Sequence, residues 1–156
     1  MSFFADLQKN IKDRLEDATA LGGLNYFQDM MIITEDQGDI ETAISKSLSR
    51  LGISIVVLLA DADCDKQNVS TPYLDNIRTV VEVAENVVIN RSRTPYKHIN
   101  DVVEHVMLYV HGFKPPSVNE VFVLDKAAVR TVEPPPGASV ARHISFTTSG
   151  GFKLST

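Results

Sequence analysis

Apolar side chains recur along this chain with two periods, one typical of strands and one typical of helices. Around residues 77–89 apolar positions alternate with others, which predicts one long strand in a packed sheet, carrying Val81, Val83, Val87 and Ile89. From Ile99 onward the apolar residues fall at i, i+3, i+4, i+7, i+8 and i+11, so they share one face of a helix that ends near Val110. Gly112 and the pair Pro115-Pro116 then predict the end of this helix.

The N-terminal half predicts two further helices. Ser2 caps a first helix, whose inner face carries Phe3 or Phe4, Leu7, Ile11 and Leu15. Asp39 caps a second helix over Ile40–Leu51, and Gly52 follows where a left-handed residue is favoured. The strands expected in this half are Met30–Thr34 and Ile53–Leu59, the second apolar enough to be covered on both faces.

The remaining segments complete an α+β pattern. Asp61–Tyr73 is polar and aperiodic, which predicts a loop. The strands expected later are Val118–Leu124, Lys126–Val132 and Val140–Thr148, with a stiff proline-rich turn at 133–137. The order of elements predicts a single α+β domain over residues 1–149, a mostly antiparallel sheet packed with two to three helices, and a flexible tail at 150–156.

Composition narrows the classes of function. The chain has 156 residues, a formal net charge of −5 and a pI near 5.3, which argues against a nucleic-acid-binding surface. Its single cysteine, Cys64, excludes an internal disulfide framework and suits a reducing compartment. We find neither the pattern of a signal peptide nor an apolar run long enough for a membrane span, so we expect no membrane partner.

The most suggestive chemistry is an acidic cluster after the apolar strand 53–59. Asp61, Asp63 and Asp65 alternate there, and carboxylates in such a cluster could hold Mg²⁺ or Ca²⁺. A calcium loop also needs a bend glycine and a later glutamate, which do not follow, and a haloacid-type phosphotransfer site needs partners on a βαβ repeat that is missing. We therefore interpret the cluster as solvated acidity, with a small metal-dependent hydrolase as an alternative.

The histidines and the cysteine indicate no assembled catalytic site. His98 and His105 are two helical turns apart, roughly 10 Å along the axis, which is too far for one metal ion. His111 lies near the helix C-terminus, where a protonated imidazole suits the dipole. Cys64 lies among carboxylates, which raise rather than lower a thiol pKa. We find no nucleophile elbow, P-loop or dinucleotide fingerprint, so we expect no catalytic residue, no metal and no cofactor.

Several blocks of the sequence together resemble a known family. The run VVEVAENVVINRS, the helix HINDVVEHVMLYVHGFKPP and the late strand SVARHISFTT are similar to phage and prophage tail-terminator proteins, the tail-completion or minor tail proteins of long-tailed phages. The similarity is greatest to the Mu-like branch, and GDIETAISKSLSRLGISIVVLLADA also fits the family's layout. The chain departs from the family at Arg91-Ser92-Arg93-Thr94-Pro95, where relatives often have a Gly-rich connection, and in its longer acidic stretch Asp61–Tyr73.

The resemblance implies a structural role in virion assembly. It implies a small subunit that closes into a hexameric ring on the tail tube, stops tube growth and presents the surface that joins the head–tail connector protein. Such a protein carries no catalytic residue or cofactor, and it lies at the head-proximal end of the virion tail after assembly in the host cytoplasm. The partners expected are further copies of itself, the tail tube protein and the connector protein.

A closed ring requires one patch of each subunit to meet a different patch of its neighbour. The candidates for this contact are Asn90, Arg91, Arg93, Leu108, Phe152 and Leu154. Six copies would carry 6 × −5 = −30 charges, and an acidic lumen lets DNA pass without specific binding. We expect Asp61, Asp63 and Asp65 to contribute to that lumen. The alternative within the same class is another head–tail connector or stopper protein.

Overall fold

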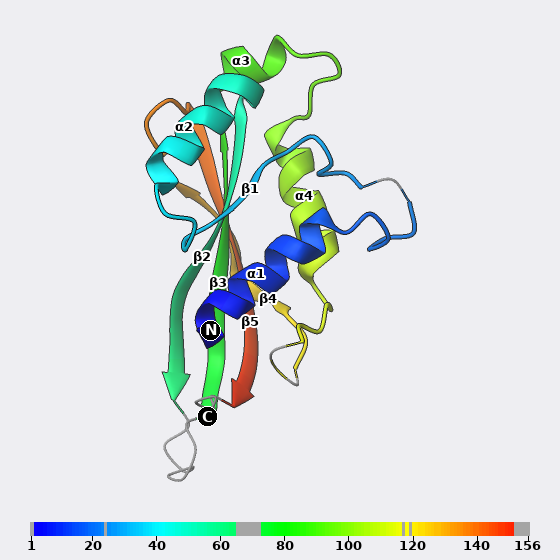
Figure 1. The fold of residues 1–156 in the computed structure, drawn as a ribbon, viewed down its shortest axis with the longest axis vertical. Coiled ribbons are helices and arrows are strands. Elements are labelled where there is room, and N and C mark those ends of the chain that lie inside the picture. The colour runs from blue at the N-terminus through cyan, green and yellow to red at the C-terminus, as the bar shows by residue number, and fades with distance from the viewer. Residues whose placement is uncertain (1, 24, 65–72, 117, 119, 152–156) are drawn as a thin grey trace.

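Within the described residues, a five-stranded sheet in the order β1-β2-β3-β5-β4 organises the chain (Figure 1). The computed structural model describes residues 2–23, 25–64, 73–116, 118 and 120–151. The elements follow in the order α1 (Phe3–Glu16), β1 (Ile32–Thr34), α2 (Ile40–Leu51), β2 (Ile53–Cys64), β3 (Tyr73–Glu85), α3 (Val87–Arg91), α4 (Ile99–Val110), β4 (Val123–Val132) and β5 (Val140–Gly151). β1 runs parallel to β2, and the other neighbouring pairs are antiparallel, which confirms the predicted α+β class.

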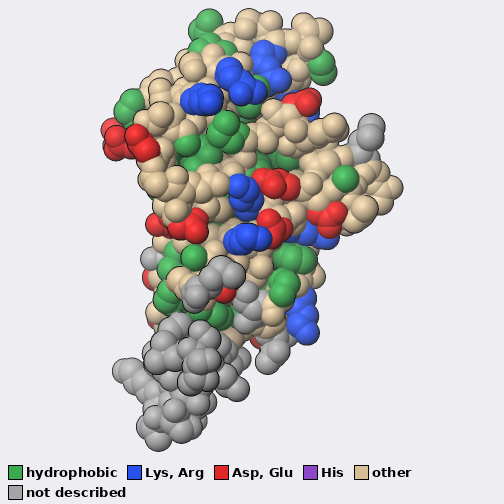
Figure 2. Space-filling model, viewed as in Figure 1, with side chains coloured by type: hydrophobic (Ala, Val, Ile, Leu, Met, Phe, Trp, Pro, Cys, Tyr) green, Lys and Arg blue, Asp and Glu red, His purple; other side chains and the backbone are tan. Residues whose placement is uncertain are grey.

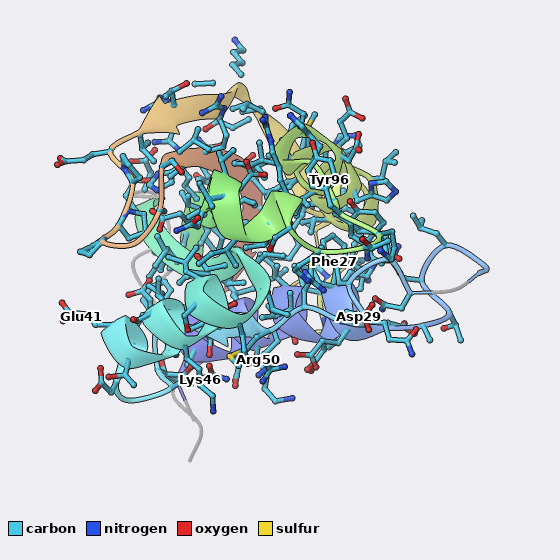
Figure 3. The ribbon with its side chains drawn as sticks, turned by 90° about the horizontal axis from the view of Figure 1, so that it is seen from above. Phe27, Asp29, Glu41, Lys46, Arg50 and Tyr96 are labelled. Atoms are coloured by element: carbon cyan, nitrogen blue, oxygen red, sulfur yellow. The ribbon has the colours of Figure 1, made fainter. Side chains whose placement is uncertain are left out.

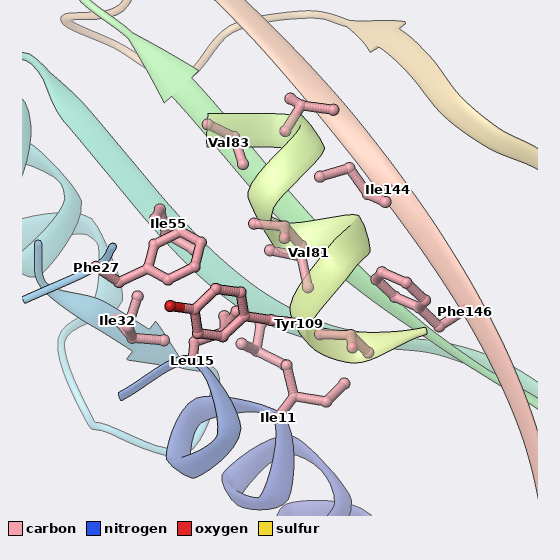
Figure 4. Packing of buried hydrophobic residues seen from close by; sticks show 14 of the residues in the cluster. Ile11, Leu15, Phe27, Ile32, Ile55, Val81, Val83, Tyr109, Ile144 and Phe146 are labelled. Atoms are coloured by element: carbon pink, nitrogen blue, oxygen red, sulfur yellow. The ribbon is translucent and has the colours of Figure 1, made fainter. Parts of the chain in front are cut away.

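The main core lies between one face of the sheet and the helices α1 and α4 (Figure 4). Val57 pairs with Val81, which pairs in turn with Ile144, so equivalent positions of three strands point to the same face. All three are fully buried, as are the inner residues Leu7, Ile11 and Leu15 of α1. Burying an aliphatic side chain of this size contributes roughly 1.5–3 kcal/mol. The apolar residues that recur with a helical period and those that recur with a strand period therefore form one hydrophobic cluster.

In the described part of the chain, α2 covers the opposite face of the sheet near one end. Leu48 of α2 packs against Ala84 and Ala141, which are small enough to let the helix approach the strands closely. Gly52 ends α2 with φ +72°, and a Cβ at this position would lie 2.3 Å from the backbone nitrogen of Asn90. Only glycine fits this contact, which brings α2 and α3 together.

The long strand predicted over residues 77–89 is wrong in its last four residues. β3 ends at Glu85, which pairs with Ile53 and Val140, and those residues begin their own strands, so no partner continues the ladder beyond them. The Asn86 side chain accepts a hydrogen bond from the Ile89 amide at 3.0 Å and starts α3 instead. The apolar residues at 87–89 belong instead to this short helix, in which Val88 faces solvent.

The loop predicted over Asp61–Tyr73 is also wrong at its two ends. β2 continues to Cys64 and β3 begins at Tyr73, with Asp61 opposite Arg78 and Asp63 opposite Asp75. We call the paired segments 59–64 and 73–79 the arm, which extends to the end of the molecule opposite α2 and α3 (Figure 1). The arm is amphipathic: Ile77 belongs to the main core and Leu59, Ala62 and Leu74 pack against it, whereas Asp61 and Asp63 are exposed. Residues 65–72, including Asp65, lie outside the described part.

The C-terminal strands differ from the prediction in their bounds. Residues 120–122 form no strand, because Phe122 is buried and its backbone pairs with Gly112 and Phe113 at the end of α4. The two strands expected around Leu124 and Lys126 are one element, β4, with an irregular register between Leu124 and Val129. β5 runs through Gly150 and Gly151, so the flexible tail does not begin at 150, and residues 152–156 lie outside the described part.

The predicted helix caps are confirmed. The Ser2 hydroxyl accepts a hydrogen bond from the Ala5 amide, and the Asp39 carboxylate accepts one from the Thr42 amide at 3.1 Å. Gly112, with φ +81°, follows α4 as expected. Among the described residues no helix is long and apolar enough to cross a bilayer.

Candidate functional site

Basic residues gather at the end of the molecule formed by α2 and α3. Arg50 closes the last turn of α2, Arg91 ends α3, and Arg93 follows it, and we call these three the basic end. Lysine and arginine side chains are grouped at this end of the space-filling view (Figure 2), and Lys46 lies near Arg50 on α2 (Figure 3). Val88 adds an apolar side chain that is 80% exposed. This end therefore offers mixed cationic and apolar contacts.

An open depression of about 490 Å³ lies beside the basic end. Its lining comes from α2, the segment before β1 and the start of the α3–α4 connection, and comprises Gln28, Asp29, Met30, Met31, Arg50, Leu51 and Arg93. The Arg93 guanidinium donates to the Leu51 carbonyl at 3.2 Å, so it satisfies an otherwise free acceptor at the end of α2. Arg93 thus has a structural role and only part of it faces solvent.

A stack of three side chains fastens the segment before β1 to α4. The Tyr26 ring lies parallel to the His105 imidazole with 3.6 Å between centroids, and the Lys97 ammonium sits 4.3 Å from the same ring. Lys97 also donates to the Tyr26 carbonyl. Burial lowers the pKa of Lys97, and burial together with the charges of Asp101 and Glu104 raises the pKa of Tyr26 to about 12. The stack keeps Tyr26 protonated and serves packing.

Each histidine of the predicted helix also has a structural role. The His98 ring accepts from the Asn100 amide at 3.1 Å and forms the N-cap of α4. His105 contacts the Asp101 carbonyl through Nδ1 at 2.7 Å, and His111 accepts from the Leu124 amide at 3.0 Å. Sequence reasoning missed the capping role of His98 because histidine is an uncommon N-cap. No group of three His, Cys, Asp or Glu suited to a metal occurs among the described residues.

The arm carries the carboxylates that the sequence singled out. Asp61 and Asp63 are exposed on β2, and Asp65 lies outside the described part. Arg78 links Asp61, at 3.5 Å, to Asp125 of β4, at 2.9 Å, so one guanidinium joins the arm to the far edge of the sheet. Asp63 lies directly opposite Asp75, and like charges at such positions are destabilising. Neither forms an ion pair with another described residue.

The proposed interface residues fall into different settings. Asn90 is fully buried, where its amide donates to Glu85 and to the Lys97 carbonyl, both at 2.8 Å, so its side chain holds the subunit together and does not reach a neighbour. Arg91 is exposed, and Leu108 is 61% exposed on the outer side of α4. Phe152 and Leu154 lie outside the described part. The structure therefore leaves Arg91, Leu108 and the exposed part of Arg93 as surface candidates.

Sequence reasoning missed a second exposed apolar surface. Val121, Val123 and Val129 are each at least 39% exposed and lie on or just before β4, the last strand of the sheet. A strand at the edge of a sheet presents unpaired backbone groups to solvent. The position of β4 at that edge follows from topology, which no local pattern in the sequence reveals.

Comparisons with known proteins add no family assignment. No protein-family model matches the chain, and a search of curated proteins finds no sequence that matches it.

Proposed function

We propose that this protein is a tail terminator of a long-tailed phage or prophage, a structural subunit that forms a ring on the tail tube and supplies the surface for head joining. The proposal starts from the resemblance of the strand 77–85, the helix 99–110 and the strand 140–148 to that family. The α+β subunit with a mostly antiparallel sheet is the architecture that the resemblance implies.

One observation carries the proposal beyond resemblance: the two ends of the molecule differ in chemistry. The basic end carries arginines beside the exposed Val88, and lysine and arginine side chains gather there (Figure 2). The arm, which lies at the opposite end of the molecule (Figure 1), exposes Asp61 and Asp63. A terminator has to contact the tube on one side of its ring and the connector on the other. A subunit with unlike ends supports such a polar arrangement.

The acidic charge supports passage of DNA through the ring. Each chain carries a net −5, so a ring of six would not attract the phosphate backbone overall. The carboxylates of Asp61, Asp63 and Asp65 remain our candidates for lining the lumen. Neutralising the three as Asn is expected to slow DNA delivery from assembled particles or to alter the assembly of the ring. Unchanged delivery with intact rings would remove this role.

Capping of tail tubes tests the function directly. Purified protein is mixed with tail tubes assembled without their terminator, and the lengths and ends of the tubes are examined by electron microscopy. We expect a six-fold ring at one end of each tube and no further growth on addition of tube protein. Tubes that keep growing, with no density at their ends, would contradict the proposal.

The same preparation separates the nearest alternative. A connector or stopper protein would bind the portal end of DNA-filled heads and leave bare tubes uncapped. Binding to both partners, with tube growth stopped, fits a terminator; binding to heads alone fits the alternative. For the hydrolase alternative, a thermal shift with Mg²⁺ that is lost in Asp61→Ala would be required.

A further inference from the structure

The sheet has two open edges. β1 pairs only with Ile55–Val57, so the arm part of β2 has no strand beside it on that side among the described residues. The Glu35 carboxylate accepts from the Leu59 amide at 2.5 Å, directly beyond the end of β1 pairing. At the other edge, β5 is the one strand that pairs with β4 within the described residues. Open edges of this kind are sites where a further strand can add.

The two open edges run in opposite directions. β2 is antiparallel to β3, β3 to β5, and β5 to β4, so β4 runs antiparallel to β2. A rotation about a ring axis that lies along the strands carries one subunit to the next without reversing them. It would therefore place β4 of one copy beside β2 of the next in antiparallel orientation, which forms well-aligned hydrogen bonds.

The side chains on the two edges are complementary in charge. The arm part of β2 exposes Asp61 and Asp63, whereas β4 exposes Lys126 and Arg130. Neither Lys126 nor Arg130 forms an ion pair within the described part of the chain. Opposite charges across neighbouring strands stabilise pairing, and like charges oppose it.

The same comparison argues against symmetric pairing. Two copies related by a two-fold axis through β4 would bring Lys126 and Arg130 against their own equivalents, and two arms would bring aspartates together. Either arrangement sets like charges face to face. Only the unlike pairing, β4 with the arm, brings opposite charges together, and it adds a second basic partner to Asp61, which within the subunit contacts Arg78 at 3.5 Å.

We infer that copies of this chain join by strand addition, with the outer edge of β4 of one copy pairing antiparallel with the arm edge of β2 in the next. The contact is heterologous, so it closes into a ring when the rotation allows. The inference rests on the proposed function only for the closed ring, and it names the strands that form the contact. It also gives Asp61 and Asp63 a role at the contact between copies.

Charge reversal on each edge tests the pairing. The first variant carries Lys126→Glu and Arg130→Glu, and the second carries Asp61→Lys and Asp63→Lys, so each has two edges of like sign. We expect roughly tenfold or greater weakening of self-association for each alone, and recovery when the two are mixed, because unlike edges then alternate around the assembly. Light scattering after size exclusion gives the mass.

The matched control is Lys9→Glu with Lys46→Glu, which changes the net charge as the first variant does but on exposed positions of α1 and α2, outside both sheet edges and the basic end. It is expected to assemble as the wild type does. Unfolding curves check that each variant is folded. If the arm variant fails to fold, the wild-type chain still tests the contact. Isotopically labelled and unlabelled copies are mixed and coupled with a zero-length carbodiimide. We expect a link between copies from Lys126 to Asp61 or Asp63.

The outcomes separate this inference from the proposed function. Assembly of the first variant as strong as wild type, or rings whose intermolecular links lie elsewhere, would overturn the edge pairing and leave the terminator proposal standing. A wild-type chain that stays monomeric without such links up to roughly 1 mM also overturns it. Edge links together with tubes that remain uncapped would support the pairing and contradict the terminator function.

Discussion

The body of the subunit and its arm are built from the same two strands but have opposite chemistry. In the body, Val57, Val81 and their neighbours are fully buried beneath α1 and α4. In the arm, β2 carries two exposed aspartates, Asp61 opposite Arg78 and Asp63 opposite the half-buried Asp75 of β3. The buried residues of the body stabilise the fold, whereas the exposed charges of the arm are accessible for contacts with other molecules. Substitutions in the two regions should therefore differ in what they change.

The largest effect is expected in the body. Phe146 is fully buried against the α4 side of the sheet, and Phe146→Ala should lower the free energy of unfolding by about 3–5 kcal/mol through lost burial and a cavity. Urea denaturation measures the change. Leu108→Ala, at a side chain 61% exposed, is the control and should cost less than about 0.5 kcal/mol. Equal losses in both would contradict the assignment of the core.

A smaller loss is expected where Asn90 joins α3 to β3. Asn90→Ala removes the donors to Glu85 and to the Lys97 carbonyl, and leaving such buried acceptors unpaired costs about 1–3 kcal/mol. Equilibrium unfolding measures this loss. Asn90→Ala should affect assembly only through this loss of stability. A folded Asn90→Ala variant that fails to assemble would instead support a role for Asn90 at the interface between copies.

The cap of α2 should show a pH-dependent effect. Hydrogen bonds from the Thr42 hydroxyl and amide lower the pKa of Asp39, so its ionised form stabilises the native state. This contribution is present above the pKa of the unfolded chain and is lost as pH falls through the lowered native pKa. Asp39→Ala should therefore melt below wild type near neutral pH, and the gap should narrow in acid.

Thermal melts at several pH values measure that gap. Asp39→Ser is the control, because a serine hydroxyl caps the helix without titrating. The difference in melting temperature between Asp39→Ser and Asp39→Ala should therefore stay constant over the pH range in which the Asp39 carboxylate titrates. A gap between wild type and Asp39→Ala that grows on acidification would contradict the assignment.

The smallest effect on stability is expected in the arm. Asp63→Asn removes the like charge opposite Asp75 and should stabilise the isolated subunit by at most about 1 kcal/mol, more at low salt than at high salt. Glu133→Gln, an exposed carboxylate in the turn before β5, is the control. Denaturation at two ionic strengths measures both. A destabilised Asp63→Asn subunit would show that the aspartate supports the fold and would break the contrast with the body.

The sequence predicts the body far better than the edges. Helical spacing at Leu7, Ile11 and Leu15 and at Val102, Val103 and Val106 correctly identified buried faces, because burial imposes a period on the chain. The same reasoning failed at 87–89, where the side chain of Asn86 and the end of two partner strands decided the structure.

Long-range placement explains what local patterns missed. The arm part of β2 shows only a weak apolar alternation, because the small Ala62 is the one apolar side chain between Asp61 and Asp63, so this segment resembled a loop. Asn90 resembled a surface turn residue, although the close approach of Gly52 encloses it. The exposed valines of β4 gain meaning only from the strand order, which depends on contacts far apart in sequence.

The contact between Glu35 and Leu59 has a further consequence for specificity. β1 occupies the edge of β2 up to Val57, and the Glu35 carboxylate then holds the amide of Leu59. A strand that adds to this edge therefore meets a fixed boundary and begins its pairing beyond Leu59. A slip of one residue would turn every side chain of the added strand to the opposite face of the sheet. Such a boundary therefore fixes the pairing register of the added strand.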